Sequence, residues 1–249
     1  MVSNNMPEGP SIIILKEEAQ PFAGRKILFA DGDTRKIDLT RIQQKKVLRF
    51  QSWGKHFLIE FNGFTLRIHF LLFGSYTVNI PKDRVARLHL HFTNGDLYFY
   101  SCSIKILEGD VNSHYDWTGD VMNPGWDKRK AKRKIKTLPD TMVCDTLLHQ
   151  DIFAGVGNII KNEVLFRIRV HPESINAKLS DYKLNLLIRE ARQYSFDFLE
   201  WKKNYVLRKH WLVHTKKTCV RCHGPIIRKI TGQFARRSFF CSHCQPLYA

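Results

Sequence analysis

Four of the six cysteines form two close pairs near the end of the chain. Cys219 and Cys222 make the first pair, Cys241 and Cys244 make the second, and eighteen residues separate them. Each C-x-x-C turn can present two sulfurs to one ion, so the spacing predicts one structural zinc ion held by four thiolates. A tetrahedral site of this kind leaves no position for water, and we expect it to do no chemistry. Disulfide bonds are the alternative.

Positive charge strongly exceeds negative charge. The chain has 40 Lys and Arg against 23 Asp and Glu, a formal net charge of +17. Residues 201–249 hold eleven Lys and Arg and no acid, and residues 128–136 hold seven basic residues. This surplus favours a polyanionic partner, either nucleic acid or an anionic membrane surface. The apolar stretches are short and interrupted by Glu60, Arg67 and His69, so no membrane association is expected. The start of the chain shows no secretory pattern, which predicts a reducing cytoplasm.

The first half of the chain has the pattern of an antiparallel sheet. Asn62-Gly63 and Asn94-Gly95 predict hairpin turns between short apolar runs. The spacing indicates a sandwich or a barrel, preceded by a short helix around Leu15–Ala19. The expected strands are Lys26–Ala30, Lys46–Gln51, His56–Phe61, Phe64–Phe70, Tyr76–Ile80, Leu88–Thr93 and Leu97–Ser101.

Past about residue 120 the apolar spacing becomes helical. Asn158–Phe166 and the stretch from Leu184 to Phe198 predict two helices, which make a helix-turn-helix-like unit. The basic stretch Trp126–Lys136 is a linker or a first helix. Cys102 and Cys144 are isolated, and we expect them to be buried as small apolar side chains.

The start of the chain carries the most specific signal. Met6-Pro7-Glu8 resembles the beginning of proteins of the formamidopyrimidine-DNA glycosylase/endonuclease VIII family, in which loss of the Met exposes proline as the nucleophile. Further matches follow in the family's order: Ser52–Lys55, Arg67–Gly74, Ala154–Asn158, and the cysteine hairpin with Arg236 and Gln245. The resemblance implies an α+β multidomain fold. It comprises an N-terminal β-sandwich (residues 6–118), a helix-two-turn-helix domain (119–210) and a zinc finger (211–249), with DNA between the halves.

The resemblance also implies a bifunctional DNA glycosylase and AP lyase. A free α-amine has a pKa of about 7.7–8.0, so a useful fraction is neutral and nucleophilic at cellular pH. We expect Pro7 to attack the sugar C1′ and expel the damaged base. Because the proline amine is secondary, the resulting iminium stays cationic and draws electrons for elimination of the 3′ and then the 5′ phosphate. Glu8 resembles the family's general acid/base.

Three further residues are expected to contact phosphate. Lys55 matches the family lysine that contacts phosphate beside the lesion and assists base departure. Asn158 begins a helix after two glycines, where it can grip a phosphate, although a plain helix cap is the alternative. Arg236 matches the finger-tip arginine that clamps the phosphate next to the flipped nucleotide, and Arg237 is the alternative register.

A base must leave the stack before its C1′ can be attacked, and the void must be filled. Leu71, Leu72 and Phe73, which follow His69, align with the family's intercalating loop. Core packing is the alternative for this apolar run. His69 is expected among the DNA-binding residues.

Several features bear on the substrate and on activity. Leu97–Ile104 looks more like the endonuclease VIII branch, which favours oxidised pyrimidines in double-stranded DNA over formamidopyrimidine or 8-oxoguanine lesions. Abasic sites are expected substrates too. Ser11 stands where the family usually has a second glutamate. With residues 1–5 retained, Pro7 has no free amine, so we expect translation to begin at Met6 or the extension to be foreign to the natural protein.

The rival hypothesis is a catalytically inactive homologue that only binds damaged DNA. In either case we expect a monomer in a bacterial cytoplasm, associated with the nucleoid through DNA binding.

Overall fold

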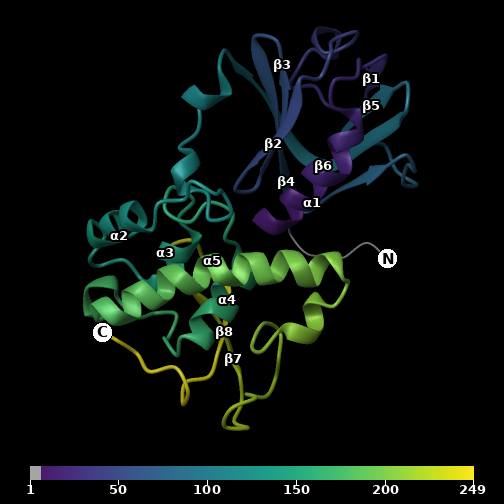
Figure 1. The fold of residues 1–249 in the computed structure, drawn as a ribbon. Coiled ribbons are helices and arrows are strands. Elements are labelled where there is room, and N and C mark those ends of the chain that lie inside the picture. The colour runs from purple at the N-terminus through teal and green to yellow at the C-terminus, as the bar shows by residue number, and fades with distance from the viewer. Residues whose placement is uncertain (1–6) are drawn as a thin grey trace. The chain divides into compact units, whose positions relative to one another are not determined.

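The chain forms two compact units, Met1–Asp116 and Trp117–Ala249, in a computed structural model that describes residues 7–249 (Figure 1). Met6 and the five residues before it lie outside the described part. The four-cysteine segment belongs to the second unit together with the helices.

The first unit is an antiparallel sheet of six strands with one helix. Strand order is β1-β5-β6-β4-β3-β2. The helix α1 packs against β2, β3 and β4 (Figure 1). The expected β-sandwich is confirmed. The elements are α1 (Gly9–Ala19), β1 (Phe29–Asp31), β2 (Arg49–Trp53), β3 (His56–Phe61), β4 (Phe64–Val78), β5 (Leu88–Phe92) and β6 (Gly95–Glu108).

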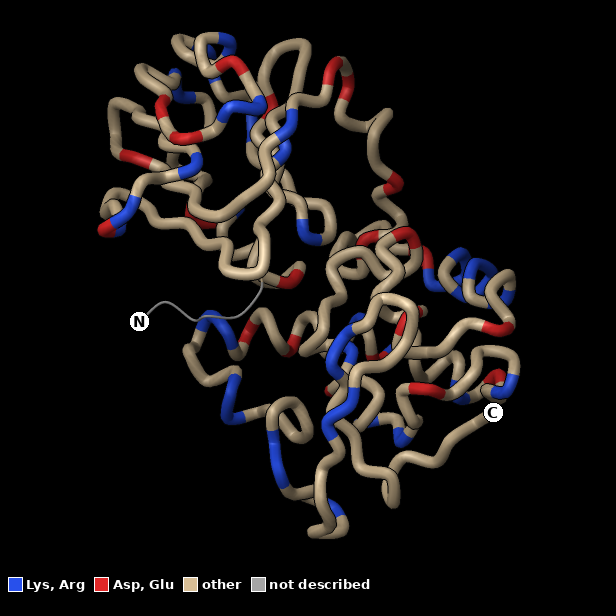
Figure 2. Tube along the Cα trace, turned by 180° about the vertical axis from the view of Figure 1, so that it is seen from behind, with Lys and Arg blue, Asp and Glu red and all other residues tan. Residues whose placement is uncertain are grey.

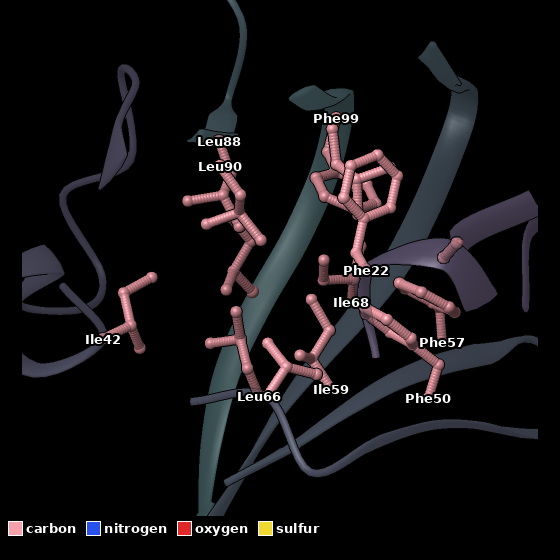
Figure 3. Close-up of a cluster of buried hydrophobic side chains, with 14 of the residues drawn as sticks. Phe22, Ile42, Phe50, Phe57, Ile59, Leu66, Ile68, Leu88, Leu90 and Phe99 are labelled. Carbon is pink, nitrogen blue, oxygen red and sulfur yellow. The ribbon is translucent and has the colours of Figure 1, made fainter. Parts of the chain in front are cut away.

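The core of this unit is a cluster of apolar side chains that lies between the strands and α1. Figure 3 shows its leucine, isoleucine and phenylalanine side chains converging from several strands. On α1, Ile12, Leu15 and Ala19 recur at helical spacing and are buried, so one stripe of the helix faces the sheet.

The second unit combines helices with a two-stranded C-terminal hairpin. Asp127 caps α2, since its side chain accepts the backbone N–H groups of Arg129 and Lys130, and so the basic stretch is a helix. Ser180 caps α5, whose buried face matches the spacing seen in the sequence. The elements are α2 (Lys128–Lys136), α3 (Val143–Leu148), α4 (Asn158–Arg167), α5 (Asp181–Lys203), β7 (Ile227–Thr231) and β8 (Arg236–Phe240).

Most expected elements are confirmed, but β1 and β2 begin three residues later than expected and β6 continues to Glu108. Two differences go beyond bounds. The separate strands expected at Phe64–Phe70 and Tyr76–Ile80 are one strand, β4, because both parts pair with β6. The short helix α3 was missed, because its six residues are too few to show a helical period.

Candidate nucleic-acid and metal sites

The Pro7-Glu8 pair stands directly before α1. Pro7 is half-buried, whereas the Glu8 side chain is buried with 1% exposure. Glu8 is the N-cap residue, its backbone oxygen accepts the N–H of Ser11 at 2.8 Å, and Pro10 follows in the first turn. The rigid helix start therefore holds a buried carboxyl group beside the residue expected to be the nucleophile. The Ser11 hydroxyl, also buried, finds no hydrogen-bond partner in the described chain.

Lys55 and His69, both expected to contact DNA, are brought together by the strand register. Lys55 follows Gly54 in the β2–β3 turn, where Gly54 has φ +52°. His56 and His69 are cross-strand partners, and His69 Nδ1 lies 3.3 Å from the backbone oxygen of Lys55. Burial, with smaller contributions from His69, Arg67 and Lys55, lowers the pKa of His56 to about 3. Burial lowers the pKa of His69 as well, so the backbone of Lys55 adjoins imidazoles that resist protonation.

Leu71, Leu72 and Phe73 lie outside the core, so the alternative interpretation that they pack in the core is wrong. They bulge from β4, because its pairing with β6 stops at Phe70 and resumes at Ser75. Their exposures are 52%, 53% and 67%, large values for apolar side chains. A Cβ on Gly74 would lie 2.6 Å from the Cβ of Phe70, so the close return of the bulge requires glycine.

Asn158 is the first residue of α4, after Gly157 at the N-cap. A glycine cap has no side chain to accept the N–H groups of the first turn, and no side-chain cap bond forms. The Asn158 Oδ1 atom is buried without a partner in the described chain.

Helix α4 carries three buried polar residues that the sequence reading assigned no role. Lys161 and Glu163 are 0% exposed and Asn162 is 1% exposed. Lys161 Nζ donates to Ser238 Oγ at 2.9 Å, and Asn162 Oδ1 accepts the N–H of Phe239 at 3.3 Å. Both bonds attach β8 to α4.

Glu163 holds the segment that leads to the hairpin. Its carboxylate accepts the backbone N–H groups of Leu212, Val213 and His214 at 2.8–3.1 Å. Burial raises the pKa of Glu163, whereas these donors lower it. His214 is partly buried, and this burial, together with Lys161, lowers its pKa to about 4.

The tip of the β7–β8 hairpin is fixed by Asp145 of α3. Its carboxylate accepts the N–H groups of Gln233 at 2.8 Å and Phe234 at 3.1 Å. Gly232 has φ +70°, and a Cβ there would lie 2.2 Å from Asp145 Oδ1. Arg236 and Arg237 follow this tip and are both exposed. Asp145 was also missed, because its partners lie 88 and 89 residues away in the chain.

The four cysteines of the two pairs meet at one point. Their sulfurs lie within 4.8 Å of one another, with Cys219 to Cys244 at 3.8 Å and Cys222 to Cys241 at 3.5 Å. Four ligands at about 2.3 Å from a central ion would be roughly 3.8 Å apart in a tetrahedron, so the donor set fits a metal ion and disulfides are absent from these pairs. Cys102 and Cys144 are buried and apart from this site, as expected.

The backbone around the cysteine site favours thiolates. The N–H of Arg221 points at Cys219 Sγ at 3.5 Å. Burial raises the pKa of Cys219, but this donor and the N–H of Cys222 bring it to about 7. Gln245, buried at 1% exposure, accepts the N–H of Cys241 and donates to the oxygen of Val170, which holds the second cysteine pair to the loop after α4.

Basic residues gather on particular elements of the second unit. Figure 2 shows them along α2, where only Ala131 and Ile135 are buried. None of the helices in the described range is long and apolar enough to cross a membrane.

Two family models match the chain. The formamidopyrimidine-DNA glycosylase N-terminal domain matches residues 6–103, and the formamidopyrimidine-DNA glycosylase H2TH domain matches residues 123–203. Together they take in Pro7, Glu8, Lys55 and Asn158.

Curated relatives include endonuclease 8-like proteins. Endonuclease 8-like 3 of Mus musculus is 32% identical over 205 residues, covering 78% of this chain and 34% of the relative. The chain thus spans about a third of the length of that protein. Endonuclease 8-like 2 of Bos taurus is 26% identical, covering 97% of this chain and 96% of the relative.

Solved structures share the fold at low identity. Lactococcus lactis Fpg, in a complex with DNA containing an oxidised pyrimidine, has a TM-score of 0.84 at 21% identity and covers 96% of this chain. All of that chain is covered in turn. A viral DNA glycosylase has a TM-score of 0.82 at 21% identity, covering 96% of this chain and 99% of its own.

Proposed function

The chain belongs to the formamidopyrimidine-DNA glycosylase/endonuclease VIII family, and on that premise we propose that it excises oxidised bases from duplex DNA and cleaves the strand as an AP lyase. The observation that carries the proposal is the pair at the start of α1. Pro7 directly precedes Glu8, whose carboxyl group is buried. A nucleophile and a proton-transfer group on a rigid helix start are what the chemistry needs.

In the proposed reaction the Pro7 nitrogen forms a bond to the sugar C1′ while the C1′–base bond breaks, and the base leaves after taking up a proton. Glu8 protonates the opening sugar, which gives the iminium. Loss of a C2′ proton then expels the 3′ phosphate, and a second elimination expels the 5′ phosphate. Water finally hydrolyses the iminium and frees Pro7. The amine acts only when residues 1–6 have been removed or were never present.

The phosphate contacts are proposed for Lys55, Asn158 and Arg236. Successive residues of a strand point to opposite faces, so Arg236 lies on the same face of β8 as Ser238. Ser238 contacts Lys161 of α4, the helix that Asn158 begins. This shared face supports Arg236 over Arg237 as the clamp.

The exposed bulge at Leu71, Leu72 and Phe73 is proposed to fill the void left by the flipped nucleotide. Exposed apolar side chains are unfavourable in water and are stabilised when they are inserted between bases. Their exposure therefore supports a role as a wedge in the DNA stack. His69, next to Lys55, is proposed to contact the strand beside it.

The four cysteines are proposed to hold one zinc ion with a structural role. Such an ion would fix the fold of the hairpin that carries Arg236, and Cys219, Cys222, Cys241 and Cys244 would fill all of its positions. Oxidised pyrimidines are the proposed substrates, supported by the endonuclease 8-like relatives.

Borohydride trapping tests the mechanism. Added during reaction with duplex DNA carrying an oxidised pyrimidine or an abasic site, it should reduce the iminium and join protein to DNA at Pro7. A chain that begins at Met6 should be trimmed and give the adduct, whereas one that keeps residues 1–6 should bind DNA and give none. Glu8→Gln should impair base excision strongly. A cross-link that maps to Lys55, with Pro7→Gly fully active, would overturn the assignment.

A further inference from the structure

A second cluster of potential metal ligands lies in the first unit, on the hairpin of β5 and β6. His89 and His91 stand two residues apart on β5 and therefore project from one face of the strand. Asp96 on β6 is the cross-strand partner of His91. Its Oδ1 atom lies 2.7 Å from His89 Nε2 and 2.9 Å from His91 Nδ1. One ligand atom from each residue falls within 4.8 Å of the others.

The surroundings of His89 fix the orientation of its ring. Its other nitrogen, Nδ1, lies 2.8 Å from Asp31 Oδ1 on the neighbouring strand β1. The ring also stacks on Tyr98, with centroids 4.3 Å apart and planes 7° apart. A histidine that donates its Nδ1–H to a carboxylate presents the lone pair of Nε2 on its other side, which is the usual arrangement around a metal-bound histidine.

That arrangement leaves an electrostatic problem at Asp96. A neutral His89 ring has one N–H for two carboxylates. When its Nδ1–H donates to Asp31, the lone pair of Nε2 faces the Asp96 carboxylate at 2.7 Å, and the two repel each other unless a cation lies there. The cation can be a proton on His89 or a metal ion bound by both residues. His91 adds a second imidazole at the same carboxylate oxygen, and two imidazoles with one carboxylate are a donor set suited to zinc, cobalt and nickel.

We propose that His89, His91 and Asp96 form a second metal site, separate from the four cysteines, for a divalent transition-metal ion such as Zn²⁺. Asp31 orients His89 from behind without binding the ion. The side chains of His89, His91 and Asp96 are 18%, 45% and 22% exposed, so the ion can enter from solvent and keep water ligands. The ion would join β5 to β6 and, through Asp31, hold the short edge strand β1.

Metal titration of the zinc-loaded protein tests the proposal. Calorimetry with added Zn²⁺ should give a further equivalent beyond the ion of the cysteine site. Co²⁺ should bind there with weak visible bands and no thiolate charge-transfer absorption, because no sulfur takes part. The expected affinity loss is at least tenfold for His91→Ala and for Asp96→Asn, which keeps the shape of the side chain. Asp31→Asn should weaken binding less.

His114→Ala is the matched control, because His114 belongs to the same unit and its Nε2 lies 2.8 Å from the backbone oxygen of Glu108. It should leave binding unchanged. Circular dichroism of each variant checks that the sheet is retained. Absence of a further equivalent, or a further equivalent that persists in both His91→Ala and Asp96→Asn, would overturn the proposal and leave the cluster as a network of ion pairs.

Discussion

The two units place their functional residues by different means. In the described part of the first unit the core is mainly apolar, and strand register sets which side chains meet, as with His56 and His69 beside Lys55. In Trp117–Ala249 the buried surface of α4 includes the charged residues Lys161 and Glu163, both at 0% exposure. Lys161 and Asp145 attach the hairpin by hydrogen bonds to Ser238 and to the hairpin backbone, and Glu163 holds the segment that leads to the hairpin.

This difference shows how each kind of packing controls position. Apolar contacts are non-directional, so the sheet relies on its ladder of backbone bonds for register. The β7–β8 hairpin has only two strands and cannot be stable alone, so it depends on directional bonds from α3 and α4. Arg236, which follows the tip, is therefore positioned by residues far away in sequence.

The largest expected effect is on the cysteine site. Cys219→Ser removes one of four thiolates, and because metal binding supplies about 10 kcal/mol or more to the folding of such sites, the hairpin should unfold. DNA binding should be lost while the thermal transition of the first unit persists. Zinc analysis, calorimetry and a DNA-binding assay measure these effects. Zinc-free protein with full activity would contradict the prediction.

A smaller effect is expected inside α4. Glu163→Gln replaces a carboxylate that accepts three backbone N–H groups with an amide that presents its own N–H to them. The free energy of unfolding of the second unit should fall by about 3 kcal/mol, as for loss of a buried charge-assisted network. Urea unfolding measures it. Glu173→Gln, which removes only the exposed pair with Lys229, should change the unfolding free energy by less than about 1 kcal/mol. Equal effects would show that the buried position has no special importance.

The stability of the first unit should depend on pH. The folded pKa of His56 is about 3, below its ordinary 6.5, so the unfolded chain takes up the proton first as the pH falls. Stability that is complete above pH 6.5 is therefore lost on acidification, by up to roughly 1.4 kcal/mol per pH unit. Unfolding of the wild type and of His56→Gln should be compared between pH 7 and 4.5. Parallel curves for the two proteins would disprove this role of His56.

The sequence predicted the strands of the first unit better than it predicted the side-chain contacts of the second unit, for physical reasons. Asn62-Gly63 and the alternating residues around it determine a local hairpin, and His56–Phe61 is observed with the expected bounds. The sequence did not decide whether Leu71–Phe73 lies in the core or on the surface, because only the interrupted pairing with β6 places it outside the core.

Long-range contacts explain what was missed in the second unit. On a helix wheel Lys161 and Glu163 look like solvent-facing residues. They are buried only because residues 212–214 and β8 return to cover them, and no local pattern encodes that return. Asp145 likewise finds its partners only after the hairpin has formed.

The smallest expected effect compares the two neighbouring arginines at the hairpin tip. Arg236 shares a face of β8 with Ser238, which contacts α4, whereas Arg237 points to the other face. Arg236→Ala should therefore weaken binding to damaged duplex DNA by about 2 kcal/mol, as expected for one charge-assisted bond, and should reduce the slope of log affinity against log salt by about one. Arg237→Ala should have less effect on both. Because both side chains are exposed, neither variant should change the unfolding free energy by more than about 0.5 kcal/mol, so a binding loss reports contact with DNA. Fluorescence anisotropy at several salt concentrations measures both quantities. If Arg237→Ala gives the larger loss of binding, Arg237 is the clamp. The face of β8 that contacts α4 through Ser238 then does not determine which arginine meets the phosphate.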